Sequence, residues 1–122
     1  MRKDSEQRQE ETGDEFKFQG SFVPTELFLL HERKVVSARD VMLLLIIHSL
    51  SCLKRGCFAS NQRLGKRLGI SAVRAAHMIM DLKRKRFVKV EVTRKKWRNG
   101  ELVRNLTVVW GSIRTDAQKL LK

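Results

Sequence analysis

The spacing of apolar residues along the chain predicts helices first and a pair of strands later. Residues 41–47, VMLLLII, are apolar on every side, which is typical of a helix that is covered all round. Ser37, with Asp40 three residues later, resembles a capping box and would begin this helix, which runs to about residue 52. The neighbouring helices and a sheet could supply the cover, or a second copy of the chain could supply it in a homodimer. A shorter helix is expected just after Pro24.

Residues 61–82 predict two short helices joined by a glycine turn. Gly69 can end the first helix in the left-handed conformation, and Gly65 is small enough for another helix to approach closely. Ser60 and Ser71 are the expected N-caps of the two helices. The core-facing residues of the second helix recur every three or four positions, at Ala75, Met78, Ile79 and Leu82. An ordinary helical hairpin in a core is the alternative interpretation.

From Phe87 onward apolar residues alternate with polar ones, which predicts a strand, a hairpin at Asn99 and Gly100, and a returning strand over 102–110. A two-residue loop would leave the apolar residues of the two strands on opposite faces. We expect the three-residue loop 98–100, with Gly100 left-handed, because it collects the apolar residues on one face. This register pairs Val88 with Trp110, Val90 with Val108, and Val92 with Leu106. A terminal tail or short helix is expected at 112–122.

The charge of the chain is strongly positive and unevenly placed. Lys and Arg number 26 against 13 Asp and Glu, which gives a net charge of +13. Residues 1–15 hold three basic and six acidic side chains, a balance of −3, and so few apolar ones that a disordered tail is expected, followed by an extended arm at Phe16, Phe18 and Phe22. Residues 54–98 hold fifteen basic and two acidic side chains, 15 − 2 = +13. Because this stretch includes the two short helices, it predicts contact with phosphate groups, of DNA or of RNA.

Residues suited to catalysis or metal binding are sparse. The three histidines are scattered, and the sequence contains neither a nucleophile elbow nor a phosphate-binding loop, so we expect no enzyme and no cofactor. His48, Cys52 and Cys57 are too few for a structural zinc site, and both cysteines are expected to be reduced and at least half-buried, with His48 in the core. Without an apolar run of about 18 residues or a signal sequence, we expect a cytoplasmic protein that binds neither membranes nor small molecules.

Helices followed directly by a basic hairpin resemble a winged helix-turn-helix domain, and the likeness covers about residues 22–110. It is most similar to the domain found in phage and plasmid replication proteins. Their turn into the motif reads much like residues 56–61, GCFASN, and is followed by a leucine pair like Leu64 and Leu68 and a glycine like Gly69. Phe22, Val23 and Pro24 before a short helix also match that group.

The resemblance implies an α+β fold, mainly α with a β-hairpin wing, over residues 16–111. The likeness to replication proteins also implies a protein of a mobile genetic element that binds double-stranded DNA. Because the same domain occurs in transcriptional regulators, the resemblance indicates DNA binding more firmly than it indicates the process. Such a protein would act in replication initiation or transcriptional regulation, as a dimer on repeated sites. The second helix of the motif would enter the major groove and the wing would meet the backbone.

Charge and resemblance together predict DNA contacts in three places. These are the start and face of the first helix (Ser60, Asn61, Lys66), the second helix (Ser71, Ala72, Val73, Arg74, Ala76, His77, Met80, Arg84) and the wing (Arg94, Lys95, Lys96, Arg98, Arg104). Trp97 would cover the hairpin or lean on a sugar.

The second helix departs from the family pattern in the residues that would face the groove. Of Ala72, Val73, Ala76, His77 and Met80, only His77 can form a hydrogen bond. We therefore expect sequence reading to be weak, based on thymine methyl groups, or based on DNA shape. The same residues support a second hypothesis, an adaptor or assembly protein that binds a partner through Val73, Ala76 and Met80, while the wing binds nucleic acid non-specifically.

Overall fold

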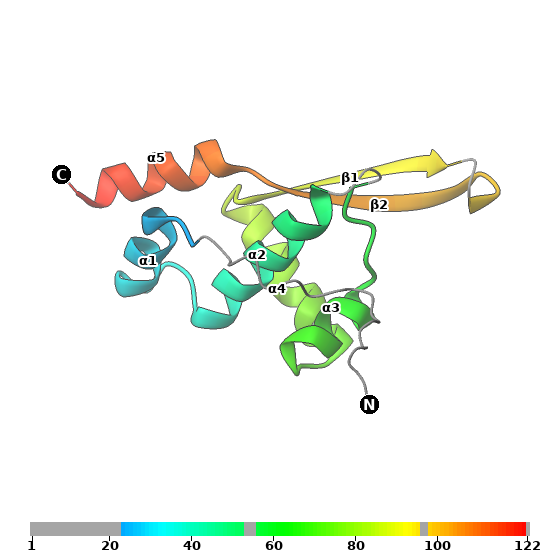
Figure 1. The fold of residues 1–122 in the computed structure, drawn as a ribbon, viewed down its shortest axis with the longest axis horizontal. Helices are drawn as coiled ribbons and strands as arrows, with labels where there is room; N and C mark the ends of the chain where they lie inside the picture. Colours follow the sequence, from blue (N-terminus) through cyan, green and yellow to red (C-terminus); the bar gives the residue numbers. More distant parts are fainter. Residues whose placement is uncertain (1–22, 53–55, 96–97, 122) are drawn as a thin grey trace, which may run out of the picture.

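The computed structural model describes residues 23–52, 56–95 and 98–121, and Figure 1 shows their arrangement. Within these ranges the elements are α1 (Thr25–Glu32), α2 (Ala38–Ser51), α3 (Asn61–Leu68), α4 (Ala72–Arg84), β1 (Val88–Lys95), β2 (Glu101–Val108) and α5 (Trp110–Leu120). The predictions for the N-terminal tail and arm, for Lys96 and for Trp97 lie outside the described residues.

Hydrogen bonds from local side chains set the starts of three helices, as the sequence predicts. The Ser37 hydroxyl accepts a bond of 3.0 Å from the Asp40 N–H, and the Asp40 carboxylate accepts one of 2.9 Å from the Ser37 N–H. The hydroxyls of Ser60 and Ser71 each accept a bond of 3.1 Å from the backbone N–H three residues on. Each bond satisfies a backbone donor that the first turn of a helix leaves without a partner.

The turn between α3 and α4 depends on two glycines. Gly69 ends α3 in the left-handed conformation, with φ of 73°, which confirms its predicted role. Gly65 is buried, and a Cβ added there would lie 2.8 Å from the carbonyl oxygen of Ile70 and 2.9 Å from that of Ser71. The small residue therefore admits the backbone of the turn, rather than a neighbouring helix as the sequence suggested.

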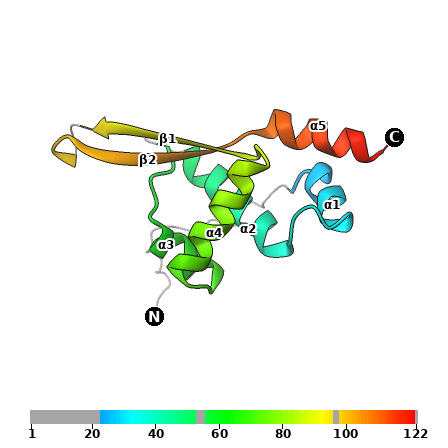
Figure 2. The same cartoon turned by 180° about the vertical axis from the view of Figure 1, so that it is seen from behind.

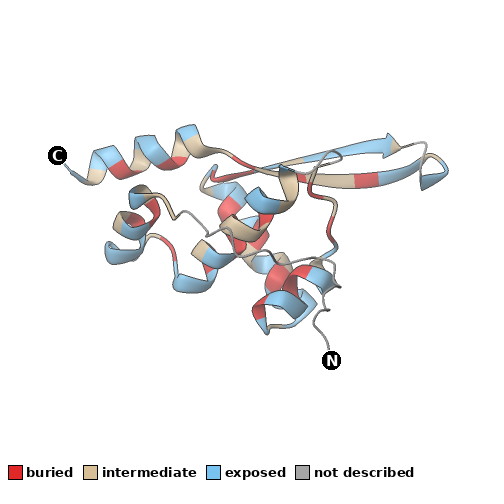
Figure 3. Cartoon of the chain, in the orientation of Figure 1, coloured by how far each residue is buried: buried red, intermediate tan, exposed pale blue. Residues whose placement is uncertain are grey.

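The apolar helix α2 lies at the centre of the molecule and contacts α1, α3 and β2. Leu43, Leu44 and Ile47 are fully buried. Met42 is 48% exposed and Leu45 is half-buried, so the expectation that the chain covers this helix all round is wrong for one of its sides. Figure 3 shows buried residues in all five helices and in β2, with exposed residues along much of β1 and on the outer side of α5.

The two strands form an antiparallel hairpin whose register differs from the predicted one by two residues. Val88 pairs with Val108, Val90 with Leu106 and Val92 with Arg104, in place of Trp110, Val108 and Leu106. The last pair of the hairpin joins Lys95 to Glu101, so the strands end before the predicted three-residue loop 98–100 is reached. Because side chains alternate with a period of two, this shift leaves the predicted apolar residues on one face.

Contacts beyond the hairpin explain this register. The Val109 N–H donates to the Phe87 carbonyl at 2.9 Å, and α5 begins at the next residue, so β2 ends too early to include Trp110. On the other edge of β2, the Leu106 N–H donates to the Cys57 carbonyl at 3.0 Å. The predicted pair of Val88 with Trp110 is therefore replaced by the start of α5.

Helix α5 belongs to the packed core. Ile113 and Ala117 are buried, and α5 packs against α1, where Arg114 lies 3.6 Å from Glu26. Figures 1 and 2 show the wing projecting beyond the helices at the opposite end of the molecule from α5, while α4 runs from the turn after α3 to the base of the hairpin. None of the helices in the described ranges has the length and apolarity needed to cross a membrane.

Candidate nucleic-acid interface

Helix α4 presents one side to the core and the opposite side to solvent. Ala75, Ile79 and Leu82 are buried. At about 100° per residue, the middle of the opposite face falls on the row Val73, His77, Met80 and Arg84, which we call the α4 row. All four are exposed, and the exposed fractions of Val73 and Met80 are 66% and 59%.

The two alanines predicted to face the groove lie beside the α4 row. Ala72 is exposed and Ala76 is half-buried. Both side chains end at Cβ, so they leave the helix backbone close to the surface on that side. The interpretation of 61–82 as a helical hairpin enclosed in a core is therefore wrong.

Exposed cations lie on α3 and in the first turn of α4. Arg63, Lys66 and Arg67 are exposed on α3, which packs against α4, and Arg74 is exposed in the first turn of α4. These four form no ion pair with any residue in the described part of the chain. Their charge is therefore not neutralised by the part of the fold that holds them.

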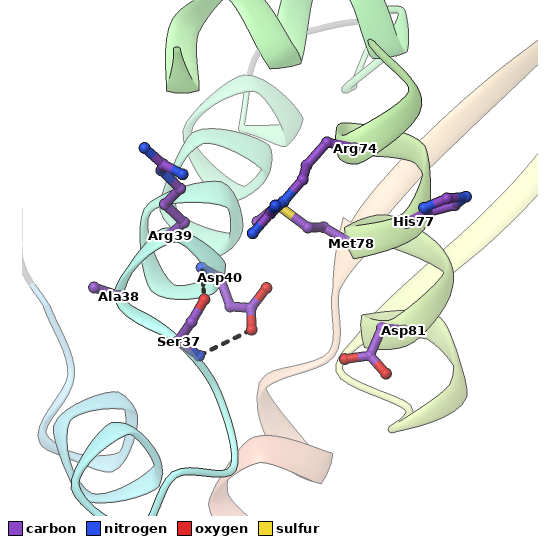
Figure 4. A pocket seen from close by; sticks show the side chains of 8 residues that line it. All are labelled: Ser37, Ala38, Arg39, Asp40, Arg74, His77, Met78 and Asp81. Atoms are coloured by element: carbon purple, nitrogen blue, oxygen red, sulfur yellow. Dashed lines mark hydrogen bonds between the residues drawn. The ribbon is translucent and has the colours of Figure 1, made fainter. Parts of the chain in front are cut away.

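A cleft of about 650 Å³ separates the start of α2 from α4. Figure 4 shows Arg74 extending from α4 toward α2, where Arg39 lies, while His77 points away from α2. The two carboxylates of the cleft already have partners: Asp40 accepts the capping bond of α2, and Asp81 lies 3.0 Å from the Lys85 ammonium. The arginines are therefore the groups left to bind an anion here.

Arg39 is absent from the residues predicted from the sequence. It stands at the start of α2, more than thirty positions before Arg74, and only the packing of the two helices brings both to one cleft. The local sequence carries no signal for this, because the residue lies in the first turn of a helix that reads as core.

The wing holds the second group of predicted contacts. The guanidinium of Arg94 donates to the Gly100 carbonyl at 3.0 Å, and the Lys95 ammonium lies 5.6 Å from the centre of the Phe58 ring. Arg98 lies 3.5 Å from Glu101. Arg94 and Arg98 remain exposed despite these contacts, so their charge stays accessible at the projecting end of the molecule.

Asn61 and Arg104, both predicted to contact DNA, bind each other. The Arg104 guanidinium donates to the Asn61 Oδ1 and to the Ala59 carbonyl, each at 2.7 Å. Burial lowers the pKa of the Arg104 guanidinium below its ordinary value. These bonds attach β2 to the start of α3, and both side chains remain half-buried, so their contact with DNA stays a prediction. Ser60, predicted in the same place, is exposed and caps α3.

His48 and Cys52, at the end of α2, are exposed although the sequence predicted both to be at least half-buried. His48 is exposed, and its Nδ1 accepts a bond of 3.2 Å from the Trp110 Nε1–H, so its predicted place in the core is wrong. Cys52 is also exposed, 3.8 Å from the His48 Nε2, whereas Cys57 is buried as expected. Among the described residues, no group of three or more His, Cys, Asp and Glu is arranged to hold a metal ion.

Comparison of the sequence with protein-family models gives no match, and comparison with curated proteins gives none. The fold is similar to the solved structure of a "possible transcriptional regulator" from Methanosarcina mazei Go1, with a TM-score of 0.56 and 12% sequence identity over 78% of this chain and 75% of that chain. Helices α2, α3 and α4 followed by the hairpin have the order of a winged helix. The fold is a winged helix-turn-helix. At 12% identity the likeness concerns the fold alone.

Proposed function

We propose that this protein binds double-stranded DNA by inserting α4 into the major groove and laying the wing on the adjacent backbone. One observation carries the proposal: α4 exposes one face, and four exposed cations on α4 and on the helix packed against it have no ion-pair partner among the described residues, namely Arg63, Lys66 and Arg67 of α3 and Arg74 of α4. A phosphate backbone on either side of a groove supplies the missing negative charge.

The cleft between α2 and α4 fits the same arrangement. The cleft is lined by Arg39 of α2 and Arg74 of α4. The projecting wing carries Arg94 and Arg98. With α4 in a groove, the arginines of the cleft would meet one backbone strand and those of the wing another stretch of backbone.

We propose transcriptional control or replication initiation as the process that this DNA binding serves. The fold that the chain shares with a "possible transcriptional regulator" supports transcriptional control. The likeness of residues 56–61 to the replication proteins of phages and plasmids supports replication initiation by a mobile element. In both cases the protein would act in the cytoplasm, as a dimer on repeated sites, and without catalysis.

Two lysines provide a matched test of the proposal. Lys66 and Lys119 are both exposed and both lie in the last turn of a helix, but Lys66 borders α4 and Lys119 lies on α5. We expect Lys66→Ala to weaken binding to a random-sequence duplex and to reduce the salt slope by about one, as for the loss of one phosphate contact. Lys119→Ala should leave both unchanged. Equal effects of the two substitutions would contradict the proposed face.

The exposed apolar residues of α4 favour a second candidate, an adaptor that binds another protein through Val73, Ala76 and Met80. Ala76→Glu separates the two candidates, because it places a negative charge beside the α4 row. If α4 enters DNA, duplex binding is lost while the state of association stays the same in sedimentation. If α4 binds protein, association is lost first and the wing still binds DNA.

A further inference from the structure

The face of α4 that would meet DNA contains few groups that can read bases by hydrogen bonds. Of the α4 row, Val73 and Met80 are apolar, and Arg84 lies in the last turn, 3.5 Å from Asp81. The side chain of Arg74 turns toward α2 (Figure 4). His77 is thus the single hydrogen-bonding side chain in the middle of this face.

We infer that α4 selects DNA through the C5-methyl groups of thymine, which Val73 and Met80 contact in the major groove. The inference rests on the proposed function, since it needs α4 in the groove. It assigns the specificity of that site to two side chains and to one chemical group of the ligand.

The chemistry of the groove supports thymine as the partner. The major-groove edges of the four base pairs present hydrogen-bond donors and acceptors, and the thymine methyl is their one apolar group. An apolar side chain set against guanine or cytosine would remove water from polar atoms without replacing the hydrogen bonds. Against a thymine methyl, Val73 and Met80 instead bury apolar surface.

Charge complementarity favours DNA over protein as the occupant of this face. Arg63, Lys66 and Arg67 are exposed on α3, which packs against α4, and Arg74 is exposed in the first turn of α4. Burying these cations in a protein interface would require acidic partners for each, whereas two phosphate strands flank every major groove. The short side chains of Ala72 and Ala76 let the helix backbone come close to the bases.

Synthetic duplexes test the inference without a known binding site. Alternating dA–dT and dA–dU duplexes have the same base pairs and the same minor groove, and they differ by the C5-methyl group. We expect the full chain to bind the dA–dT duplex more tightly, by about fourfold for one contacted methyl and about fifteenfold for two, the factors that correspond to buried methylene groups. Replacing cytosine by 5-methylcytosine in a dG–dC duplex should raise affinity by a similar factor.

Two substitutions assign the effect to the α4 row. Val73→Ser removes both methyl groups of the side chain and leaves a hydroxyl, and Met80→Gln keeps the length of its side chain. Each should reduce the thymine-to-uracil ratio toward one. Met42→Gln is the matched control, because it makes the same change at a methionine of similar exposure on α2, 48% against 59% for Met80, and it should leave the ratio unchanged.

The outcomes are distinct. Equal binding to the thymine and uracil duplexes, with salt-dependent binding intact, would overturn the inference and keep the proposed function. If the unmodified protein bound none of the duplexes, both the inference and the proposed function would be wrong. If Met80→Gln abolished self-association in sedimentation and left the ratio unchanged, the face would be a protein contact and the inference would be wrong.

Discussion

At the scale of single residues, two helical glycines have opposite surroundings. Gly65 in α3 has the backbone of the following turn within 3.0 Å of an added Cβ, whereas a Cβ on Gly111 in α5 would have no described atom within 4 Å beyond its chain neighbours and its own helix backbone. Alanine favours a helix over glycine by about 1 kcal/mol, so only the clash can make Gly65→Ala unfavourable.

We therefore expect opposite signs for the two substitutions. Gly65→Ala should lower the free energy of unfolding by about 2 kcal/mol, because a Cβ forced against backbone atoms costs more than helix propensity returns. Gly111→Ala should raise it by up to about 1 kcal/mol. Urea denaturation of both variants measures the difference, and stabilisation by Gly65→Ala would show that the turn does not approach α3 as described.

The two cysteines also differ in ways that a reagent can detect. Burial raises the pKa of the Cys57 thiol above its ordinary value of 9.0, so the folded chain holds it protonated, while Cys52 is exposed. We expect iodoacetamide to modify Cys52 in the native protein and Cys57 only after unfolding, because the thiolate is the reactive form.

The raised pKa also fixes the sign of a pH effect. The contribution of protonated Cys57 to stability is complete below its pKa in the unfolded chain and is lost as pH rises through its higher pKa in the folded one. The iodoacetamide experiment is measured by peptide mass spectrometry, and rapid modification of Cys57 in the native protein would contradict its burial.

At the scale of elements, the attachment of the wing depends on Arg104. Its guanidinium joins β2 to the start of α3 through Asn61 and the Ala59 carbonyl. We expect Arg104→Ala to lower the free energy of unfolding by about 2 kcal/mol, the range for hydrogen bonds to a charged group. The loss should be smaller by about 1 kcal/mol when Asn61 is already alanine.

Arg94→Ala is the control for this prediction. Arg94 is exposed and bonds a carbonyl within the hairpin loop, so its removal should change stability by no more than about 0.5 kcal/mol. Additive losses for Arg104 and Asn61 in a double-mutant cycle would contradict the bond between them.

The elements also show which features the sequence can predict. The starts of α2, α3 and α4 were predictable because each depends on a serine hydroxyl and backbone donors within three residues. The hairpin register was not, because it depends on the Leu106 bond to Cys57 and on the start of α5, contacts that join distant parts of the chain. Local patterning fixed the face of each strand and left the shift of two residues open.

The residues of the candidate site also separate into those that the local sequence predicts and those that depend on packing between distant elements. Exposure of Val73 and Met80 followed from the spacing of Ala75, Ile79 and Leu82 in one helix. The pairing of Arg104 with Asn61, and the place of Arg39 beside Arg74, follow from packing between elements far apart in sequence. Neither could be read from local periodicity.

At the scale of the whole molecule, the described elements separate into two ends. The wing projects at one end, and α1 and α5 pack together at the other (Figures 1 and 2). A duplex bound along α4 and the wing would leave α1 and α5 uncovered. This separation predicts which parts of the chain sense DNA and which do not.

The most direct test is a titration of the isotope-labelled protein with a short duplex, followed by the NMR shifts of its backbone amides. We expect the largest changes at Ser71, Val73, His77 and Met80 in and before α4 and at Arg94 and Arg98 in the wing, with α1 and α5 unchanged. Changes confined to the wing, or centred on α1 and α5 while α4 stays unperturbed, would contradict the insertion of α4 into DNA.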